Sequence, residues 1–482
     1  MKVCIINTGG TISSVGAPLA PMPPADFARA AEELLGPALR AALPGVEACY
    51  DGALSFAGGA AALDSTDLRP SDWCRIAGRV LDLYDSFDGF VILHGTDTMD
   101  YSGTGLALLL NVPGPFGLPR ATLSKPLILT GAQLPLFRQA PEGLVLNAGS
   151  DAFANLSGAL QAATLRLPEV GVFFDGRLLR GSRALKVSTR RFAAFDSPHL
   201  PPLAESGIGI WHGAARPLPS PAAPKLALDH PDARALVRAQ LEAVAARIDA
   251  LRVPLISAVP ADHRADAPLM ARLVEAALDG AAGLVLEGFG EGNIPAGLGA
   301  MEAALRAASV LVVIASRPVG GRTGAFHYAA GAWIAQTGAI GAGDMTPVAA
   351  VAKLLVLTAA APHHGWDLAT LAALMTRSLV GERAALDRME APLLPGMRLQ
   401  AADAAAELVN DPDSGPRLAG WQAPGPGRLE MRGAHLVLVA PDGAATELAT
   451  GPGQAPLPVL TAAGLMLVDP SHREAPILAL PC

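Results

Sequence analysis

The sequence contains few cysteines, few aromatic residues and no basic cluster, and each shortage excludes a class of protein. Aromatic residues make up 5% of the chain, and only four of its 482 residues are cysteines: Cys4, Cys49, Cys74 and Cys482. The cysteines are scattered, without a CxxC pair or a metal-binding spacing, so neither a disulfide framework nor a metal site is indicated. We expect no metal, and a reducing, cytoplasmic environment fits this cysteine usage best.

Basic clusters and long apolar runs are also missing. The formal net charge is −8, and the densest basic pair, Arg190-Arg191, is interpreted as a solvated loop. Binding to nucleic acid requires clustered lysines and arginines, so such a partner is not indicated. The nearest approach to a membrane-spanning run, residues 348–361, contains Lys353 and predicts a buried helix. Met1 leads directly into a strand candidate without the regions of an export signal, so we expect no export and no membrane partner.

Apolar residues are plentiful and form 51% of the chain, enough for two or three domains with their own cores. Over residues 1–205, the pattern predicts strands over 3–6, 89–93, 126–129 and 169–174, and helices over 26–43, 70–85 and 101–110. This alternation predicts a mostly parallel sheet covered by helices on both faces. Cys4 lies in the first strand, where we expect a core position.

The rest of the chain divides into three parts. Proline, serine and alanine are frequent in residues 206–250, which we interpret as a linker. A second α/β unit is predicted over 251–382, with strands over 252–258, 283–286 and 310–315 and a helix over 266–278. Residues 383–482 contain short apolar runs separated by turn signals, which predicts a small β-rich appendage. The expected fold class is therefore α/β, with a larger N-terminal and a smaller C-terminal parallel-sheet domain plus this appendage.

Two short segments place glycines and hydroxyl groups directly after predicted strands: Thr8-Gly9-Gly10-Thr11-Ile12 and His94-Gly95-Thr96-Asp97-Thr98-Met99. Ligands bind at the carboxyl ends of strands in open α/β sheets, and glycines there let the backbone approach a ligand closely. A threonine hydroxyl becomes a nucleophile when a base removes its proton and donors stabilise the oxyanion. Each segment also has a structural alternative. The first fits a turn before a helix, and the second fits a capped strand-to-helix turn with His94 as a hydrogen-bonded structural residue.

Lys186, flanked by apolar residues, has two interpretations. A lysine in this pattern is usually a surface residue whose aliphatic stem covers apolar neighbours. Buried beside a threonine hydroxyl, it would instead act as a base. Burial disfavours the charged form of a lysine, whereas a neighbouring aspartate favours it, so the sequence leaves its charge state open.

Taken together, these segments resemble the bacterial-type L-asparaginase family, and its cytoplasmic, type I branch more than its secreted branch. The resemblance covers residues 1–382 and includes further matching stretches over 125–133, 180–188, 194–198, 284–295 and 343–346. It implies hydrolysis of L-asparagine to L-aspartate and ammonia by a threonine nucleophile, with no metal and no organic cofactor.

The resemblance also implies a role for individual residues. Thr8 matches the nucleophile that attacks the side-chain amide of the substrate. Thr96, Asp97 and Lys186 match a second catalytic set, in which the lysine helps to deprotonate a threonine or an attacking water. Ser65 matches the ligand of the substrate's α-carboxylate and Asp97 that of its α-ammonium. The full set of implied substrate-binding residues is Gly9, Ser65, Thr66, Thr96, Asp97 and Ala132.

One position departs from the family pattern. The family usually has a tyrosine in the loop after the first segment, near the nucleophile, but none of the four tyrosines lies in residues 13–26. We therefore expect Ser13, Ser14 or a residue of a partner subunit to activate Thr8, or the activity to be weak. Residues 134–150 form a longer stretch than usual, which is expected to reshape the mouth of the site.

The family further implies a homo-oligomer, a dimer or a tetramer, in which the loop over residues 287–293 faces a partner subunit. Three alternatives to L-asparagine hydrolysis stay open. In the first, the substrate is L-glutamine or another amide. In the second, the chain is an amidase component of a tRNA-dependent amidotransferase. In the third, it is a weakly catalytic amino-acid-binding or regulatory protein. The lack of a basic stripe after Arg383 argues against the second. One methylene changes discrimination by only about 1–3 kcal/mol, so the sequence does not separate asparagine from glutamine.

Overall fold

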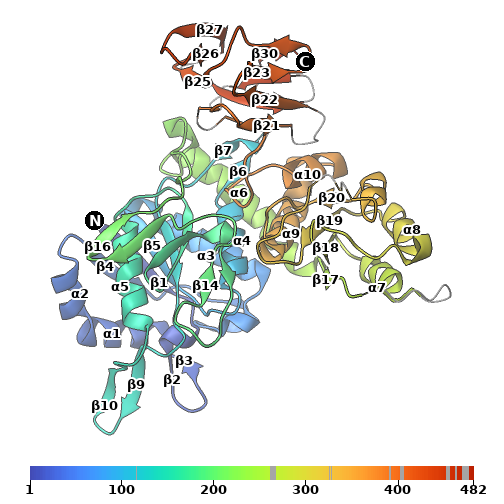
Figure 1. Ribbon diagram of the computed structural model, residues 1–482. Helices are drawn as coiled ribbons and strands as arrows, with labels where there is room; N and C mark the ends of the chain where they lie inside the picture. Colours follow the sequence, from blue (N-terminus) through green and yellow to red (C-terminus); the bar gives the residue numbers. More distant parts are fainter. Residues whose placement is uncertain are drawn as a thin grey trace.

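The fold is described from a computed structural model that covers residues 1–114, 117–260, 268–324, 326, 328–389, 392–401, 406–451, 456–461, 464–468 and 477–481. Three parts are visible in Figure 1: a large N-terminal unit, a smaller unit coloured yellow to orange, and a β-rich unit coloured red. The first two are the α/β domains that the sequence predicts, and the third is the β-rich appendage.

The N-terminal unit is built on an eight-stranded sheet. The strands from β11 to β4 run parallel, whereas β11, β12, β15 and β16 are joined by antiparallel pairing. The prediction of a mostly parallel sheet is therefore confirmed. In spatial order the strands are β16 (Gly209–His212), β15 (Ala204–Gly207), β12 (Arg177–Arg180), β11 (Val170–Phe174), β8 (Leu127–Thr130), β5 (Gly89–Leu93), β1 (Lys2–Asn7) and β4 (Glu47–Asp51).

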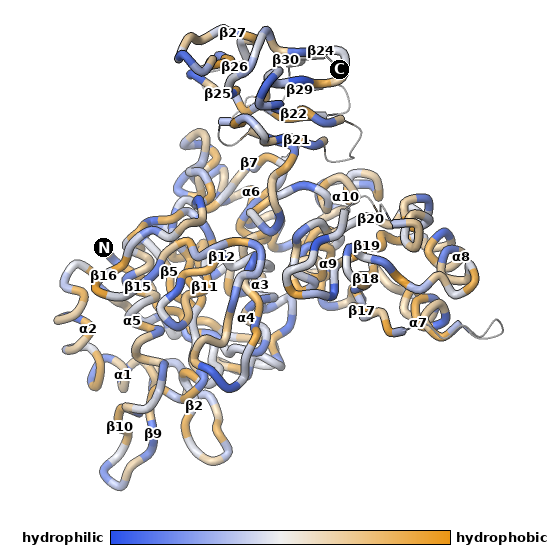
Figure 2. The backbone as a smooth tube through the Cα atoms, viewed as in Figure 1, coloured by the Kyte–Doolittle hydropathy of each residue, from blue (hydrophilic) through white to orange (hydrophobic). Residues whose placement is uncertain are grey.

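Both faces of this sheet are covered, because successive residues of a strand point to opposite sides. Cys4 and Ile6 of β1 belong to a core formed with the helices on one side, α3 (Pro70–Leu83) and α4 (Met99–Leu109). Val3 and Ile5 face a second core formed with α1 (Pro24–Leu34), α2 (Gly36–Ala42) and α5 (Ala152–Ala163). Figure 2 shows the apolar residues of β5 and β11 gathered between these helices. Cys4 is fully buried, as predicted.

Residues 206–250 are not a linker, which corrects the prediction from composition. They contain β16 and helix α6 (Pro231–Ala245), which packs against α3 and α9. The buried positions of α6 include Val237, Leu241 and Val244, which recur at helical spacing and join the main core of the N-terminal unit. The N-terminal domain predicted over 1–205 therefore extends through these residues, and we propose 251–382 and 383–482 as the other two domains.

The smaller unit is a four-stranded parallel sheet flanked by helices. Its strands are β17 (Leu255–Ser257), β18 (Leu284–Gly288), β19 (Val312–Ser316) and β20 (Ile340–Gly341). Helices α7 (Leu269–Leu278) and α8 (Ala300–Arg306) pack together, and the predicted start of α7 at residue 266 lies outside the described residues. Helix α9 (Pro347–His364) contacts both α4 and β18 and so joins the two units, and α10 (Leu368–Met375) follows it.

The β-rich appendage consists of three small antiparallel sheets with their own core of leucines, including Leu408, Leu429 and Leu436. It contacts the N-terminal unit where Val459 and Val468 pack on Leu118, beside the hairpin of β6 (Val112–Pro113) and β7 (Pro119–Ala121). The strands are β21 (Arg398–Gln400), β22 (Glu407–Asp411), β23 (Gly415–Leu418), β24 (Trp421–Gln422), β25 (Arg428–Arg432), β26 (His435–Val439), β27 (Ala445–Thr450), β28 (Leu457–Thr461), β29 (Gly464–Val468) and β30 (Ile477–Pro481).

Candidate active site

The two glycine–threonine segments meet at the carboxyl edge of the large sheet. Thr8 follows β1, His94 follows the neighbouring β5, and Gly131 follows β8, with the three strands paired in register. A Cβ atom added to Gly10, where φ is 76°, would lie 2.3 Å from the Cα atom of Gly95. Only glycine allows this approach, so the glycines bring the two backbones into direct contact.

Thr8 is held in a buried and well-defined position. Its backbone nitrogen and its Oγ1 both donate to the carbonyl oxygen of Leu93, at 2.9 and 2.8 Å. The following turn is fixed by the Oδ1 atom of Asn7, which accepts a hydrogen bond from the nitrogen of Gly9 at 2.9 Å. The Thr8 hydroxyl is therefore aimed by β5, the strand that leads into the second segment.

Lys186 joins the second segment through its ammonium group. It lies in β13 (Leu185–Lys186), which pairs with β14 (Phe195–Asp196). Its Nζ atom is 2.8 Å from Oγ1 of Thr96 and 2.6 Å from Oδ1 of Asp97, and its side chain is only 14% exposed. These contacts exclude the interpretation of Lys186 as a surface lysine. The structure thus assembles the predicted threonine–aspartate–lysine set from positions about ninety residues apart.

The helix-cap interpretation of the second segment is confirmed for the position of the cap but not for its side-chain bond. The cap residue of α4 is Thr98, and it makes no side-chain capping bond. Its hydroxyl donates instead to the carbonyl oxygen of Ser65 at 2.8 Å, while Asp97 bonds Lys186. The segment is therefore connected to its neighbours in space as well as to its own helix, whose Ser102 nitrogen donates to the carbonyl oxygen of Thr98 at 3.0 Å.

The implied substrate-binding residues surround the same edge. Ser65, in the short helix η3 (Ser65–Asp67), is buried, and its Oγ atom has no hydrogen-bond partner among the described residues. That atom would lie 2.5 Å from a Cβ atom on Gly95, so it borders the second segment. Thr66 is exposed and donates to Oδ1 of Asp64 at 2.9 Å. Ala132, which follows β8, is buried. Its neighbour Gly131 lies so close to the second segment that an added Cβ atom would be 2.4 Å from the carbonyl oxygen of His94.

His94 is a structural residue, in agreement with the alternative drawn from the sequence. Its Nδ1 atom is 2.6 Å from the carbonyl oxygen of Gly95, which only accepts, so Nδ1 carries the proton. Its Nε2 atom accepts from Oγ of Ser102 at 2.9 Å, and that hydroxyl accepts from Nε1 of Trp73. Complete burial lowers the pKa of His94 from 6.5 to about 4. The ring is therefore neutral at physiological pH and fixes the geometry of the turn.

Protonation of His94 predicts a loss of stability in mild acid. Its folded-state pKa lies below the unfolded-state value, so between pH 6.5 and about 4 the unfolded chain binds a proton that the folded chain does not. Lowering the pH from 7.5 to 5 is expected to reduce the free energy of unfolding by about 2 kcal/mol through this residue. The measurement is an NMR titration of the imidazole resonances, with the half-exposed His230 as the comparison. A His94 midpoint near 6.5 in the folded protein contradicts this account.

Two further acidic residues support the site and were given no role from the sequence. Asp100 is buried, and its Oδ2 atom accepts from the backbone nitrogen of Lys186 at 3.2 Å, while burial raises its pKa. Its place in the first turn of α4, directly after the second segment, is the signal that could have identified it. Asp151 accepts from the backbone nitrogens of Gln133 and Leu134 and so fixes the loop after β8. The partners of Asp151 lie too far along the chain for a local pattern to indicate them.

The loop that lacks the family's tyrosine forms a hairpin of β2 (Ser14–Val15) and β3 (Ala20–Pro21). A second hairpin, β9 (Phe137–Ala140) with β10 (Gly143–Leu146), packs beside it, and both project at the bottom of Figure 1. The hydroxyls of Ser13 and Ser14 both donate to the carbonyl oxygen of Gly10, at 3.3 and 2.8 Å. These serines therefore hold the turn after Thr8 and do not bond to its hydroxyl.

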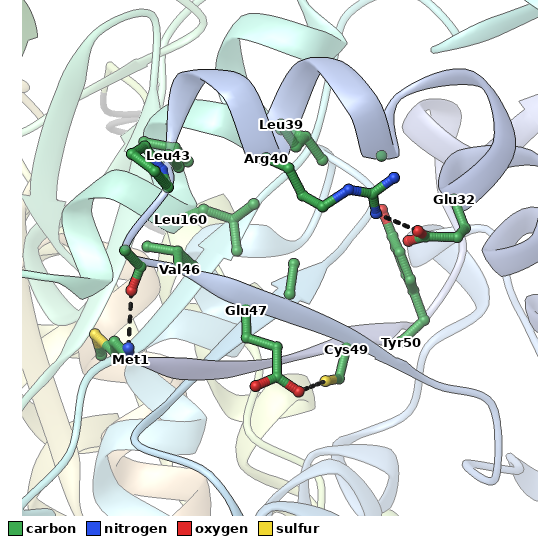
Figure 3. Close-up of a pocket in the computed structure, with 14 residues that line it drawn as sticks. Met1, Glu32, Leu39, Arg40, Leu43, Val46, Glu47, Cys49, Tyr50 and Leu160 are labelled. Atoms are coloured by element: carbon green, nitrogen blue, oxygen red, sulfur yellow. Dashed lines mark hydrogen bonds and ion pairs between the residues drawn. The ribbon is translucent and has the colours of Figure 1, made fainter.

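A cavity of about 670 Å³ lies elsewhere, near the amino ends of β1 and β4. Figure 3 shows the Glu32–Arg40 ion pair and the ring of Tyr50 at one end of it, with Met1, Leu43 and Leu160 at the other. None of the predicted site residues lines this cavity, so it is separate from the candidate active site.

Three general properties bear on the chemistry. Within the described residues, no group of three or more His, Cys, Asp and Glu side chains is arranged to hold a metal ion. Cys4, Cys49 and Cys74 are free thiols, and Cys482 lies outside the described residues. Among the helices that the structure describes, none has the length and apolar character that crossing a membrane requires.

A threonine hydroxyl beside a lysine–threonine–aspartate set, at the carboxyl edge of a parallel sheet, suits nucleophilic hydrolysis, and the relatives of the chain show that its class is amidohydrolase. Comparison with known families identifies it further: residues 2–213 match the family "Asparaginase, N-terminal" and residues 265–375 match the "Glutaminase/Asparaginase C-terminal domain". The chain belongs to the asparaginase family.

Individual relatives agree with this assignment. The chain is 33% identical to L-asparaginase 1 of Escherichia coli (strain K12) over 324 residues, which is 66% of this chain and 82% of that protein. The crystal structure of L-asparaginase I from Vibrio cholerae superposes with a TM-score of 0.58 at 29% identity, covering 80% of this chain and 99% of the other. The thermostable L-asparaginase from Thermococcus kodakarensis gives a TM-score of 0.59 at 25% identity, covering 80% and 100%. The family models end at residue 375, so the appendage lies beyond them.

Proposed function

We propose that this protein hydrolyses L-asparagine to L-aspartate and ammonia, with Thr8 as the nucleophile. The observation that carries the proposal is the position of Lys186, whose Nζ atom bonds Thr96 and Asp97 at 2.8 and 2.6 Å beside the strand end that holds Thr8. Membership of the asparaginase family supports the choice of a side-chain amide as the substrate.

In the proposed reaction, Oγ1 of Thr8 attacks the side-chain amide carbon of the substrate. The C–N bond then breaks, the nitrogen leaves as ammonia after gaining a proton, and an aspartyl ester of Thr8 remains. Water attacks this ester, which releases L-aspartate and returns the proton to the threonine hydroxyl. Because Lys186 donates to Thr96, the hydroxyl proton of Thr96 is free to point toward the reacting groups. The pair can thus deliver a proton to the leaving nitrogen and accept one from the water.

Two charged ends of the substrate require opposite anchors. The unpartnered and buried Oγ atom of Ser65 is a donor available for the α-carboxylate. The carboxylate of Asp97 is 54% exposed, so it keeps a free side for the α-ammonium while it bonds Lys186. Gly9, Thr66 and Ala132 complete the proposed contacts at the same edge of the sheet.

The proposed function does not need the missing tyrosine. The Thr8 hydroxyl is oriented by the carbonyl of Leu93, and Ser13 and Ser14 are occupied with Gly10. We therefore assign the activation of Thr8 to the Lys186–Thr96 pair, acting through the substrate or a bound water, rather than to the loop.

Ammonia release from a panel of amides tests the choice of substrate. L-asparagine is expected to give the highest kcat/KM, and L-glutamine a value lower by about 10- to 200-fold, because one methylene is worth only about 1–3 kcal/mol. The D-isomers are expected to give lower kcat/KM values, because inversion at Cα exchanges the positions of the α-ammonium and the α-carboxylate relative to Asp97 and Ser65. A higher kcat/KM for L-glutamine contradicts the assignment of asparagine. Binding of asparagine without ammonia release favours a binding or regulatory protein instead.

We also propose a homo-oligomer, a dimer or tetramer, in a reducing cytoplasm. The tip of the turn at Gly290 and Glu291 is exposed and available to a partner subunit, and the free thiols suit a reducing compartment. Light scattering after size-exclusion chromatography measures the mass directly. A monomer that remains fully active contradicts the oligomer proposal.

A further inference from the structure

The turn that precedes Lys186 is held by a segment almost two hundred residues away. This turn is the short helix η6 (Gly181–Arg183), and the segment that contacts it, residues 379–384, is here called the strap. Oγ of Ser182 donates to the carbonyl oxygen of Val380 at 3.1 Å, and Nε of Arg183 donates to that of Gly381 at 2.7 Å. The strap lies beyond the matched family domains and leads into the appendage.

Arg183 also binds the start of α9. Its Nη1 atom is 2.9 Å from Oδ2 of Asp344 and donates to the backbone oxygen of the same residue at 3.1 Å. The other carboxylate oxygen of Asp344 accepts from the backbone nitrogen of Ala384 at 2.9 Å. Arg183 is buried, so a single guanidinium fixes η6, the strap and the loop before α9 to one another.

The strap itself is rigidified by a fully buried ion pair. Glu382 lies 2.6 Å from Nζ of Lys353 on α9, and both side chains are completely buried. The carboxylate of Glu382 also accepts from the backbone nitrogens of Leu379 and Val380. Lys353 further donates to the carbonyl oxygen of Met375. These bonds define the path of the strap before it reaches η6.

The opposite side of η6 is fixed by α4. A Cβ atom on Gly103 of α4 would lie 2.7 Å from the carbonyl oxygen of Gly181, so the two backbones are in close contact. Gly381 of the strap has a φ of 77° and packs equally closely against the guanidinium of Arg180. The turn is thus enclosed on both sides, only three residues before Lys186.

We propose that the strap is a positioning element for the active site and that Arg183 is a positioning residue, which places the ammonium of Lys186 against Thr96. The inference rests on the catalytic role of Lys186 in the proposed function. Arg183 lies three positions before Lys186, so a small shift of η6 moves Nζ away from its partners. A displacement of about 1 Å at a catalytic group reduces the rate by about 10²-fold.

The experiment replaces Arg183 by lysine, which keeps the charge but cannot bond Gly381 and Asp344 together. Arg183→Lys is expected to lower kcat by about 10²-fold with KM nearly unchanged. The matched control is Arg79→Lys, because Arg79 makes a two-bond pair with Asp51 on β4, an edge strand of the sheet. The control is expected to retain activity. If Arg183→Lys fails to fold, Ser182→Ala serves as the second variant. It removes one hydrogen bond to the strap and is expected to give an intermediate loss of kcat.

A double-mutant cycle separates this inference from the proposed function. If Arg183 acts through Lys186, Arg183→Lys has little further effect on kcat in a Lys186→Met background. In the crystal structure of the single variant Arg183→Lys, Nζ of Lys186 then lies beyond hydrogen-bond distance of Thr96. Additive losses, or an unchanged Lys186–Thr96 bond in an impaired Arg183→Lys variant, overturn the positioning role and leave the proposed function intact. Full activity of Lys186→Met overturns both.

Discussion

Thr8→Ala is expected to abolish ammonia release from L-asparagine, with a loss of about 10⁴-fold or more in kcat. The substitution removes the hydroxyl of a buried residue, which is its only atom that can form the ester. Binding is expected to persist, because Ser65 and Asp97 are untouched. The measurement combines a coupled ammonia assay with calorimetric titration of L-asparagine.

Two companion variants make the Thr8 result interpretable. Thr8→Ser keeps a hydroxyl and is expected to retain measurable activity. Thr164→Ala removes a threonine hydroxyl that donates to Gln161 at the end of α5, away from the predicted site residues, so it is expected to behave like the unaltered protein. Substantial activity in Thr8→Ala, with Thr164→Ala unchanged, would sink the assignment of the nucleophile.

Lys186→Met is expected to give the second largest effect, a fall of about 10²- to 10⁴-fold in kcat. Methionine fills a similar volume, but it cannot donate to Thr96 or pair with Asp97. The Lys186–Thr96 pair then no longer delivers a proton to the leaving nitrogen or accepts one from the attacking water. Thr96→Ala removes the other half of the pair and is expected to cost a comparable factor. The losses of the two variants are not expected to add, because the residues act as a unit.

The control for this lysine is Lys225→Met, at an exposed position in the short helix η7 (Pro224–Leu226). It is expected to leave kcat unchanged. Lys186→Met with wild-type turnover contradicts the account, whereas a loss confined to KM shows that Lys186 serves binding rather than chemistry.

Much of the site was readable from the sequence because it lies where buried strands end. The strand predicted over residues 89–93 coincides with β5, and its parallel pairing with β1, which the structure supplies, places His94 beside Thr8. The spacing of apolar runs fixes which residues lie at the carboxyl edge of the sheet. The choice of asparagine chemistry came from the resemblance of two segments to a family, not from these patterns.

Other features depended on contacts that local patterns do not contain. The partners of Ser182 and Arg183 lie 198 residues away in the strap, so no spacing in the sequence indicates them. Helix α6 was missed because the Pro-rich stretch before it suggested a linker, although Val237, Leu241 and Val244 follow helical spacing. Whether Lys186 is a surface or a site residue also depended on tertiary contacts, since its immediate neighbours are apolar in either case.

The most direct test of the central claim is mass spectrometry of the protein quenched with acid during its first turnover of L-asparagine. The account predicts an aspartyl ester on the peptide that contains Thr8, appearing with the first ammonia and disappearing as aspartate is released. An ester on Thr96, or ammonia release in the first turnover with the Thr8 peptide unmodified throughout, contradicts it.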